Sequence, residues 1–287
     1  MSKTKEAHAS GQNKIYEQIK AQLGEYVRVE NAEEEICELY SVYYCNKNRV
    51  DRVNSKKTEL DIEIKGGTRT LPLTIMQNPN TNGELGQTGG VLWNSSVIMS
   101  EYFAQRSAWA GDGRLDVGQA SVVELGSGCG LVGLTLHQLG ARRVALTDQK
   151  RMLRVLNKNI EACRVEPRSR KKNGPEQVVY ATEYLWGGLP EDMQIVSEPV
   201  DLVVASDCAY HEGVVALLVQ TLGALCRSRT DGVPTVVVVG QELRSDLVHL
   251  AFVEGLLSKF VVHRMPVSES VDGVFALYVA WLKSIDL

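Results

Sequence analysis

From Ser121 onward, short apolar runs alternate with segments in which apolar residues recur at helical spacing. The apolar runs have the length and the β-branched content of buried strands, and they are Ser121–Leu125, Arg143–Thr147, Gln177–Thr182, Val200–Ala205, Thr235–Val239, Phe260–Met265 and Val274–Ala280. The helical segments between them are Leu131–Leu139, Lys150–Cys163, Gly213–Cys226 and Leu243–Lys259. This alternation predicts an α/β fold: a seven-stranded, mostly parallel sheet with helices on both faces.

The residues before this region show a different pattern, in which short elements are separated by polar stretches. Apolar residues four apart predict a short helix over Lys14–Leu23, and strict alternation predicts a strand over Leu60–Lys65. A Gly-Gly turn follows this strand, so we expect Arg69–Met76 to return as the second strand of a hairpin. A longer helix is expected over Val91–Gln105, with Trp93 in its first turn.

These patterns divide the chain into three parts. Residues 1–12 are small and polar and predict a disordered tail. Residues 13–85 form an N-terminal extension with a short helix and strands, and residues 86–287 form the α/β domain. The loop Asn78–Gly90, at the boundary, is long enough to suggest a functional segment and not a plain connector.

Composition excludes several classes of protein. The chain has 287 residues, of which 44% are hydrophobic and 23% charged, and its net charge of −4 argues against direct nucleic-acid binding. Its six cysteines are scattered without C-x-x-C pairs, which indicates free thiols in a reducing compartment and no metal site. No apolar run approaches about 18 residues and no signal peptide is evident, so we expect no membrane contact and a cytoplasmic protein that can also enter the nucleus.

A glycine-rich turn joins the first strand of the α/β region to its first helix. Gly126, Gly128 and Gly130 lack a Cβ, so the backbone can turn tightly and a ligand can lie against it. Asp148 ends the second strand, where a carboxylate can accept hydrogen bonds from both hydroxyls of a ribose. This strand–turn–helix–strand unit predicts a site for an adenosine-containing cofactor.

Two cofactors compete for this site. The run Gly128–Gly133 satisfies the G-x-G-x-x-G spacing of NAD sites, a motif with many chance matches. Glu124, two residues before the first glycine, would repel a pyrophosphate but would suit the cationic sulfonium and ammonium of S-adenosylmethionine. A short-chain dehydrogenase would also need Tyr-x-x-x-Lys after the glycine turn, and the matches at Tyr16 and Tyr43 both precede it. We therefore predict S-adenosylmethionine as the cofactor, with Glu124 in its site.

Six short motifs follow one another along the chain: Gly90-Val-Leu-Trp93-Asn-Ser-Ser, Glu124-Leu-Gly-Ser-Gly-Cys-Gly-Leu-Val-Gly133, Thr147-Asp148, Tyr184-Leu-Trp186-Gly187, Ser206-Asp207-Cys-Ala-Tyr210 and Glu242-Leu-Arg244. Together they resemble the seven-strand, non-SET protein-lysine methyltransferases, specifically the methyltransferase-like 21 group of methyltransferase family 16. The likeness covers about residues 86–282. One departure is Tyr184-Leu185-Trp186-Gly187, where the family often has Leu-Asp/Thr-Trp-Gly.

The resemblance implies a role for each matching residue. The cofactor-binding residues would be Trp93, Gly126, Ser127, Gly128, Asp148, Trp186 and Ser206, and the catalytic residues at the substrate mouth would be Asp207 and Tyr210. A carboxylate can hold an incoming lysine ammonium, and an aromatic face suits a methylated cation. Asp207 is thus expected to orient the amine electrostatically and not to act as a strong base.

The implied function is S-adenosylmethionine-dependent methylation of a lysine side chain in a protein substrate. By the resemblance, that substrate could be a chaperone, an elongation factor, a ribosomal protein or an AAA-type ATPase, and the enzyme would be a monomer. Two alternatives stay open. A small-molecule methyltransferase is compatible with the Asp-x-x-Tyr motif, and a non-catalytic adaptor is compatible with the fold, although intact acids at 124, 148 and 207 argue against it.

Overall fold

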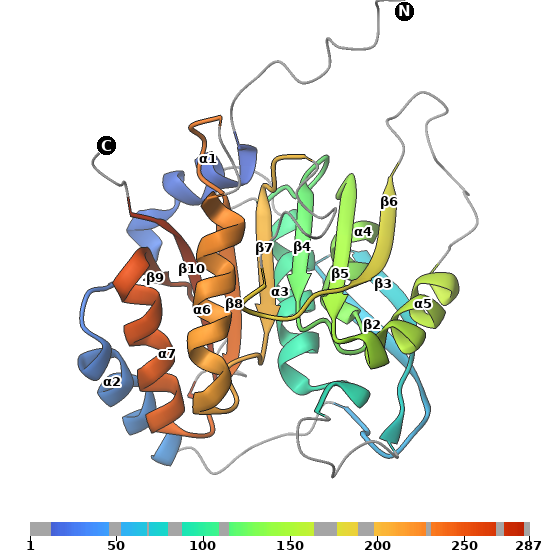
Figure 1. The fold of residues 1–287 in the computed structure, drawn as a ribbon, viewed down its shortest axis with the longest axis horizontal. Coiled ribbons are helices and arrows are strands. Elements are labelled where there is room, and N and C mark those ends of the chain that lie inside the picture. Colours follow the sequence, from blue (N-terminus) through green and yellow to red (C-terminus); the bar gives the residue numbers. More distant parts are fainter. Residues whose placement is uncertain are drawn as a thin grey trace, which may run out of the picture.

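A computed structural model gives the fold of this chain (Figure 1) and describes residues 13–45, 53–67, 69–79, 88–108, 115–163, 177–188, 198–227, 231–267 and 273–283. Its strands are β1 (Val27–Val29), β2 (Glu59–Gly66), β3 (Arg69–Met76), β4 (Ser121–Leu125), β5 (Arg143–Asp148), β6 (Val178–Glu183), β7 (Leu202–Ser206), β8 (Val236–Glu242), β9 (Phe260–Arg264) and β10 (Phe275–Leu282). Its α-helices are α1 (Lys14–Ala21), α2 (Ala32–Cys45), α3 (Asn94–Ala108), α4 (Leu131–Gln138), α5 (Leu153–Ala162), α6 (Glu212–Arg227) and α7 (Asp246–Lys259).

One large sheet organises the molecule, with strand order β1-β9-β10-β8-β7-β4-β5-β6. The five strands from β8 to β6 pair in parallel, whereas β10, β9 and β1 are antiparallel to their neighbours. The predicted α/β fold and all seven predicted strands are confirmed. The expected strand number is wrong by one, because β1 adds an eighth strand through Val29 opposite Val262.

Helices cover both faces of this sheet, as predicted. Side chains of a strand alternate between the two faces, so in β7 Leu202 and Val204 join one hydrophobic core while Val203 and Ala205 join the other. The first core contains α3, α4, α5 and the β2–β3 hairpin, and the second contains α2, α6 and α7 (Figure 1). The inner parallel strands β4, β5, β7 and β8 are buried on both faces, which explains their continuous apolar sequence.

Two N-terminal elements do not follow from the hydrophobic pattern. Strand β1 has only three residues and Val27 is 48% exposed, so its alternation is too short to recognise. Helix α2 has three consecutive glutamates in its first turn, and its buried apolar residues are Ala32, Ile36, Leu39 and Tyr40. Both elements become stable because the sheet edge and α7 offer them a surface to pack against.

The N-terminal extension shares the core of the α/β region. Ile15 and Ile19 of α1 are at most 1% exposed and belong to the first core. The side chain of Asn13 caps α1 and donates hydrogen bonds to the carbonyls of Asp201 (2.7 Å) and Pro234 (3.0 Å). The hairpin packs so closely on α3 that a Cβ at Gly66 would lie 2.8 Å from the carbonyl oxygen of Ala104.

Some predictions fall outside the described residues, namely those on residues 1–12 and most of the loop Asn78–Gly90. The six cysteines are free: four are buried, while Cys37 and Cys45 on α2 are exposed. Over the part of the chain that the structure describes, no helix combines the length and the apolar character needed to cross a bilayer.

Candidate functional site

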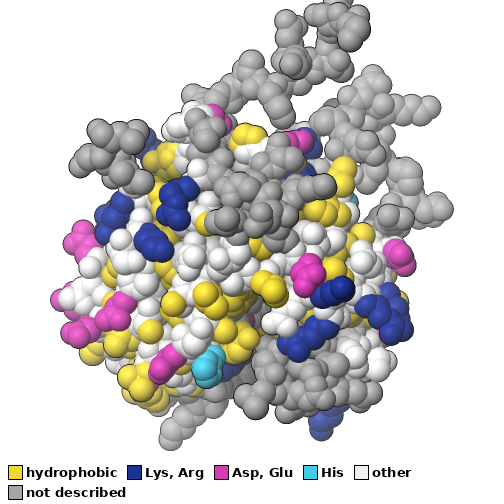
Figure 2. Space-filling model, in the orientation of Figure 1, with side chains coloured by type: hydrophobic (Ala, Val, Ile, Leu, Met, Phe, Trp, Pro, Cys, Tyr) yellow, Lys and Arg dark blue, Asp and Glu magenta, His cyan; other side chains and the backbone are white. Residues whose placement is uncertain are grey.

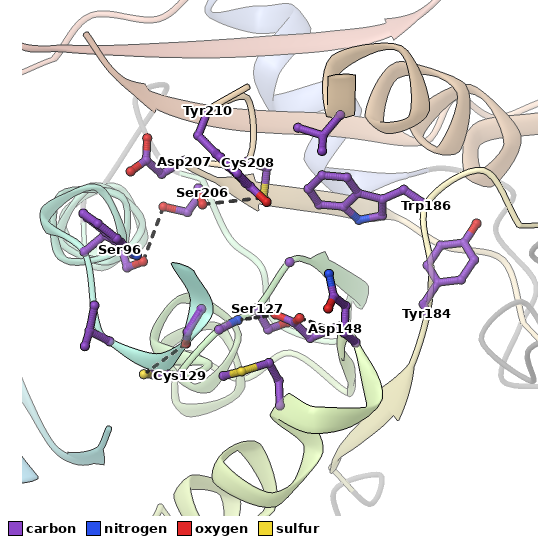
Figure 3. A pocket seen from close by; sticks show the side chains of 18 of the residues that line it. Ser96, Ser127, Cys129, Asp148, Tyr184, Trp186, Ser206, Asp207, Cys208 and Tyr210 are labelled. Carbon is purple, nitrogen blue, oxygen red and sulfur yellow. Dashed lines mark hydrogen bonds between the residues drawn. The ribbon is translucent and has the colours of Figure 1, made fainter. Parts of the chain in front are cut away.

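A cavity of about 260 Å³ opens at the carboxyl end of the parallel strands (Figure 3). Its walls come from the loops after β4, β5, β6 and β7, from the segment before α3 and from the start of α6. The chain runs from β4 outward to β6 and then returns to β7 on the other side of β4. The cavity therefore lies at the point where strand order reverses, which is where open α/β sheets bind their ligands.

The glycine loop after β4 forms the floor of this cavity. Gly126, Gly128 and Gly130 have φ angles of 59°, 54° and 84°, a region that L-residues with a Cβ rarely adopt. A Cβ on Gly126 would lie 2.8 Å from the Sγ of Cys208 and 3.0 Å from the ring of Trp186. Glycine is required there both for the backbone turn and to leave space for the neighbouring side chains.

Hydrogen bonds fix this loop to the end of β5. The Ser127 hydroxyl donates to the carbonyl of Glu124 (3.2 Å) and accepts from the amide of Thr147 (2.9 Å). The amide of Gly128 donates to Oδ2 of Asp148 (2.8 Å), and the amide of Gln149 donates to its Oδ1 (2.7 Å). Ser127 thus supports the cavity floor, and Asp148 is held in one orientation at the cavity wall.

The environment of Asp148 suits a ligand with hydroxyl groups. Burial raises the pKa of its carboxyl, and the amides of Gly128 and Gln149 partly oppose this rise. Each carboxylate oxygen receives one described hydrogen bond, so each keeps capacity for another donor. The structure therefore places Asp148 where the sequence predicted a ribose-binding acid.

Glu124 does not line the cavity, which corrects the prediction that it faces the cofactor. Its side chain is directed under the loop, where Oε2 accepts a hydrogen bond from the amide of Gly133 (3.0 Å) in the first turn of α4. Burial raises the pKa of Glu124 to about 8, so at neutral pH the carboxyl is mostly uncharged. Repulsion of a pyrophosphate by its charge, the reason given for excluding NAD, therefore does not apply.

The same hydrogen bond nevertheless argues against a dinucleotide. In dinucleotide sites the free amides of the first helical turn bind the pyrophosphate. Here Glu124 already occupies the amide of Gly133. A Cβ on Gly133 would lie 2.2 Å from the side chain of Leu146, so this glycine serves close packing between α4 and β5.

The two tryptophans predicted to contact the cofactor both line the cavity. Trp93 precedes α3, which begins at Asn94, so the prediction that it lies inside the helix is wrong by one residue. Its ring is covered by the guanidinium of Arg244, 5.1 Å from the ring centroid. Trp186 follows β6 and lies beside the glycine loop (Figure 3).

The loop after β7 brings the remaining predicted residues together. Ser206, Asp207 and Tyr210 all line the cavity, and the Ser206 hydroxyl lies 3.5 Å from that of Ser96 on α3. Tyr210 points into the cavity, whereas the carboxylate of Asp207 is turned away from Trp186 (Figure 3). The Asp-x-x-Tyr motif therefore contributes two side chains with different directions.

Asp207 is engaged by residues that the predicted site did not contain. Arg244 donates to both of its carboxylate oxygens, at 2.8 and 2.6 Å, and Gln241 donates to Oδ1 at 3.0 Å. The Asp207 side chain is only 5% exposed. Any contact with an incoming ammonium is therefore shared with Arg244.

The sequence indicated a strand in this region, but the predicted strand ended too early to include the partners of Asp207. The predicted strand ends at Val239, whereas β8 continues to Glu242. This extension carries Gln241 and Glu242 to the carboxyl edge of the sheet, beside the end of β7.

Among the described residues, no group of three His, Cys, Asp or Glu side chains could hold a metal ion.

Comparison with known proteins agrees with this geometry. The profile of the lysine methyltransferase family matches residues 72–254, more than half of the chain. The N-lysine methyltransferase METTL21A of Mus musculus is 34% identical over 141 residues, covering 49% of this chain and 56% of that protein. EEF1A lysine methyltransferase 3 of Xenopus tropicalis is 28% identical over 188 residues (66% and 71%), and the lysine methyltransferase EFM6 of Saccharomyces cerevisiae is 32% identical over 176 residues (56% and 66%).

The matched region contains the glycine loop, Asp148, both cavity tryptophans and the Asp207–Tyr210 motif. The glycine loop leaves space that a Cβ would fill, which fits the methionine part of S-adenosylmethionine. The carboxylate of Asp148 at the end of β5 fits its ribose. The alignment spans little more than half the length of the mouse relative. On the match of the family profile and on the architecture of its site, the chain belongs to the lysine methyltransferase family, which uses S-adenosylmethionine as its methyl donor.

Proposed function

We propose that this protein transfers methyl groups to the side-chain amine of a lysine in a protein substrate. S-adenosylmethionine supplies a methyl group activated on a positively charged sulfur. The observation that carries the proposal is a single cavity that joins the glycine loop and Asp148 to the loop of Asp207 and Tyr210. The residues that the proposal assigns to the cofactor and those that it assigns to the substrate thus line the same cavity.

The rim of this cavity favours a protein over a small molecule. Four of the nine large hydrophobic side chains that are exposed in the described part line it: Trp93 (37%), Leu185 (58%), Tyr210 (39%) and Leu217 (42%). Figure 2 shows hydrophobic side chains gathered beside a hollow on this side of the molecule. Apolar side chains that stay exposed around a site are typical of surfaces that bind another macromolecule.

The charges near the mouth suit a lysine. Asp207, Glu242 and Arg244 form one hydrogen-bonded cluster, and two carboxylates with one guanidinium carry a net charge of −1 when both acids are ionised. A negative mouth attracts an ammonium. A free lysine side chain has a pKa of about 10.4, so it is mostly protonated at neutral pH. Its nitrogen can attack only after it has lost this proton. An apolar wall and a nearby positive sulfur both lower the pKa of the lysine. The aromatic face of Tyr210 can contact a cationic methylated amine.

The partners and the location follow the same proposal. One relative is named for the elongation factor EEF1A, so an elongation factor is the first substrate to test. Chaperones, ribosomal proteins and AAA-type ATPases follow, and we propose that the enzyme acts as a monomer in the cytoplasm, with the nucleus as a second location.

The test is transfer of a labelled methyl group from S-adenosylmethionine into a cell lysate, followed by separation of protein from small molecules and mass spectrometry of the labelled band. We expect label on lysine in one or a few proteins, and clearly less label with an Asp148→Ala variant at the same cofactor concentration. Label only in the small-molecule fraction would support the small-molecule alternative. Calorimetry that detects no cofactor binding to the wild type would support the adaptor alternative.

A further inference from the structure

Arg244 connects three separate parts of the site although it does not line the cavity itself. It follows β8 and lies two residues before α7. Its nitrogens Nη1 and Nη2 each donate a hydrogen bond to one carboxylate oxygen of Asp207, and Nη2 also donates to Glu242 at 2.7 Å. The face of the same guanidinium covers the ring of Trp93. The loop after β7, the end of β8 and the segment before α3 are thereby joined through one side chain.

Asp207 needs such a partner for two reasons. Its φ angle is +58°, a left-handed backbone that a residue with a Cβ rarely keeps unless its surroundings hold it. Its carboxylate is almost completely buried, and a buried charge is stable only when it is paired and hydrogen-bonded. The bidentate contact with Arg244 meets both needs, and the amide of Asp207 is fixed separately by the carbonyl of Gly240 at 2.8 Å.

The planar guanidinium is suited to this task in a way that an ammonium is not. Two parallel N–H donors match two carboxylate oxygens, and the flat face can at the same time lie over an indole ring. A lysine at the same position could neutralise the acids but could not make both contacts in fixed geometry. The arrangement therefore depends on the shape of arginine as well as on its charge.

We propose that Arg244 is a positioning residue for methyl transfer: it fixes the Asp207 loop and the Trp93 ring, and so sets the orientation of the amine at the mouth. This inference rests on the proposed function. The opposing view is that Arg244 competes with the substrate for the carboxylates and so inhibits the enzyme. The two views predict opposite signs for the effect of removing the guanidinium.

The experiment compares Arg244→Gln and Arg244→Lys with wild type, using the labelled protein substrate for kcat and KM and calorimetry for S-adenosylmethionine. Arg142→Gln is the matched control, because Arg142 also forms an ion pair, with Glu198, but precedes β5 at the opposite end of the sheet. We expect Arg244→Gln to lower kcat about 100-fold, the loss typical of a misplaced reacting group, with cofactor affinity changed less than about threefold. Arg244→Lys should recover only part of the rate, and Arg142→Gln should keep the wild-type rate.

A double variant tests whether Arg244 acts through Asp207. If it does, Asp207→Asn combined with Arg244→Gln should lose no more rate than the worse single variant. A rate increase in Arg244→Gln, full additivity of the two losses, or complete rescue by Arg244→Lys would overturn the proposal.

A readout that needs no activity separates this inference from the proposed function. Removing the guanidinium from the face of Trp93 should change tryptophan emission, and that change should disappear in a Trp93→Phe background. If the wild type methylates no lysine, the proposed function fails while this spectroscopic test of the contact still stands. If methylation occurs but neither the emission nor kcat responds to Arg244→Gln, only the positioning role is refuted.

Discussion

Replacing Glu124 by glutamine should change how the stability of this protein depends on pH. Glu124 is 3% exposed, and burial raises the pKa of its carboxyl from 4.5 to about 8. Between these two values the native state holds a proton that the unfolded state has released. The stability contributed by this group is therefore fully present below pH 4.5 and is lost as the pH rises towards 8.

The size of the effect follows from the same two values. A pKa change from 4.5 to about 8 corresponds, at about 1.4 kcal/mol per pH unit, to a loss of about 5 kcal/mol across this range. Glutamine does not titrate, and its side-chain oxygen can still accept the hydrogen bond from the amide of Gly133. The unfolding free energy of Glu124→Gln relative to wild type should therefore increase from pH 5 to 8 and stay constant above it.

Urea unfolding followed by circular dichroism at several pH values from 5 to 9 measures this difference. Taking the difference between variant and wild type removes the contributions of other titrating groups. Glu161→Gln on the exposed face of α5 serves as the control, and it should shift stability by less than about 0.5 kcal/mol at every pH. A Glu124→Gln difference that does not vary with pH would show that the carboxyl is ionised in the native state and would refute the reasoning.

Three further predictions concern the cavity. Asp148→Ala should weaken S-adenosylmethionine binding by about 1–3 kcal/mol in calorimetry, the scale of a lost charged hydrogen bond, and unchanged affinity would exclude the ribose contact. Gly126→Ala should lower both stability and cofactor affinity, because its Cβ would lie 2.8 Å from a cysteine sulfur at a φ of 59°; wild-type affinity would mean that the loop can shift. Cofactor should change the fluorescence of Trp93 and Trp186, which line the cavity, but not that of Trp281, which stacks on a histidine ring elsewhere; single Trp→Phe variants decide this.

Much of the fold was predictable because it depends on local pattern. Strands buried on both faces must be continuously apolar, and covering helices must carry apolar residues at helical spacing, so the order of elements can be recognised directly. The positions of the residues predicted to bind the cofactor follow for a related reason. In a parallel sheet the loops after the strands meet at one edge, so residues placed there by the chain, such as Ser127, Asp148 and Ser206, meet in one cavity.

Other features were decided by contacts between distant parts of the chain. Strand β1 exists because β9, more than 200 residues later, offers a free edge. Asp207 meets Arg244 because β7 and β8 pair in parallel and β8 is longer than its apolar run. Such contacts leave no periodic signal, since nothing in either segment specifies its partner.

For Glu124, the local pattern decided its position in the strand and the tertiary contacts decided its chemical state. The sequence determined that an acid is the second-to-last residue of β4, and alternation along that strand places it on the same face as Val122, which helix α4 covers. Only the packed structure decided what the acid does there, because its charge depends on water, and water is removed when α4 and β5 close over the side chain. The sequence by itself thus determined which elements form and which residues reach the carboxyl edge of the sheet. The tertiary structure alone decided their burial, their charge and their hydrogen-bond partners, since these depend on what surrounds each side chain and not on its neighbours along the chain.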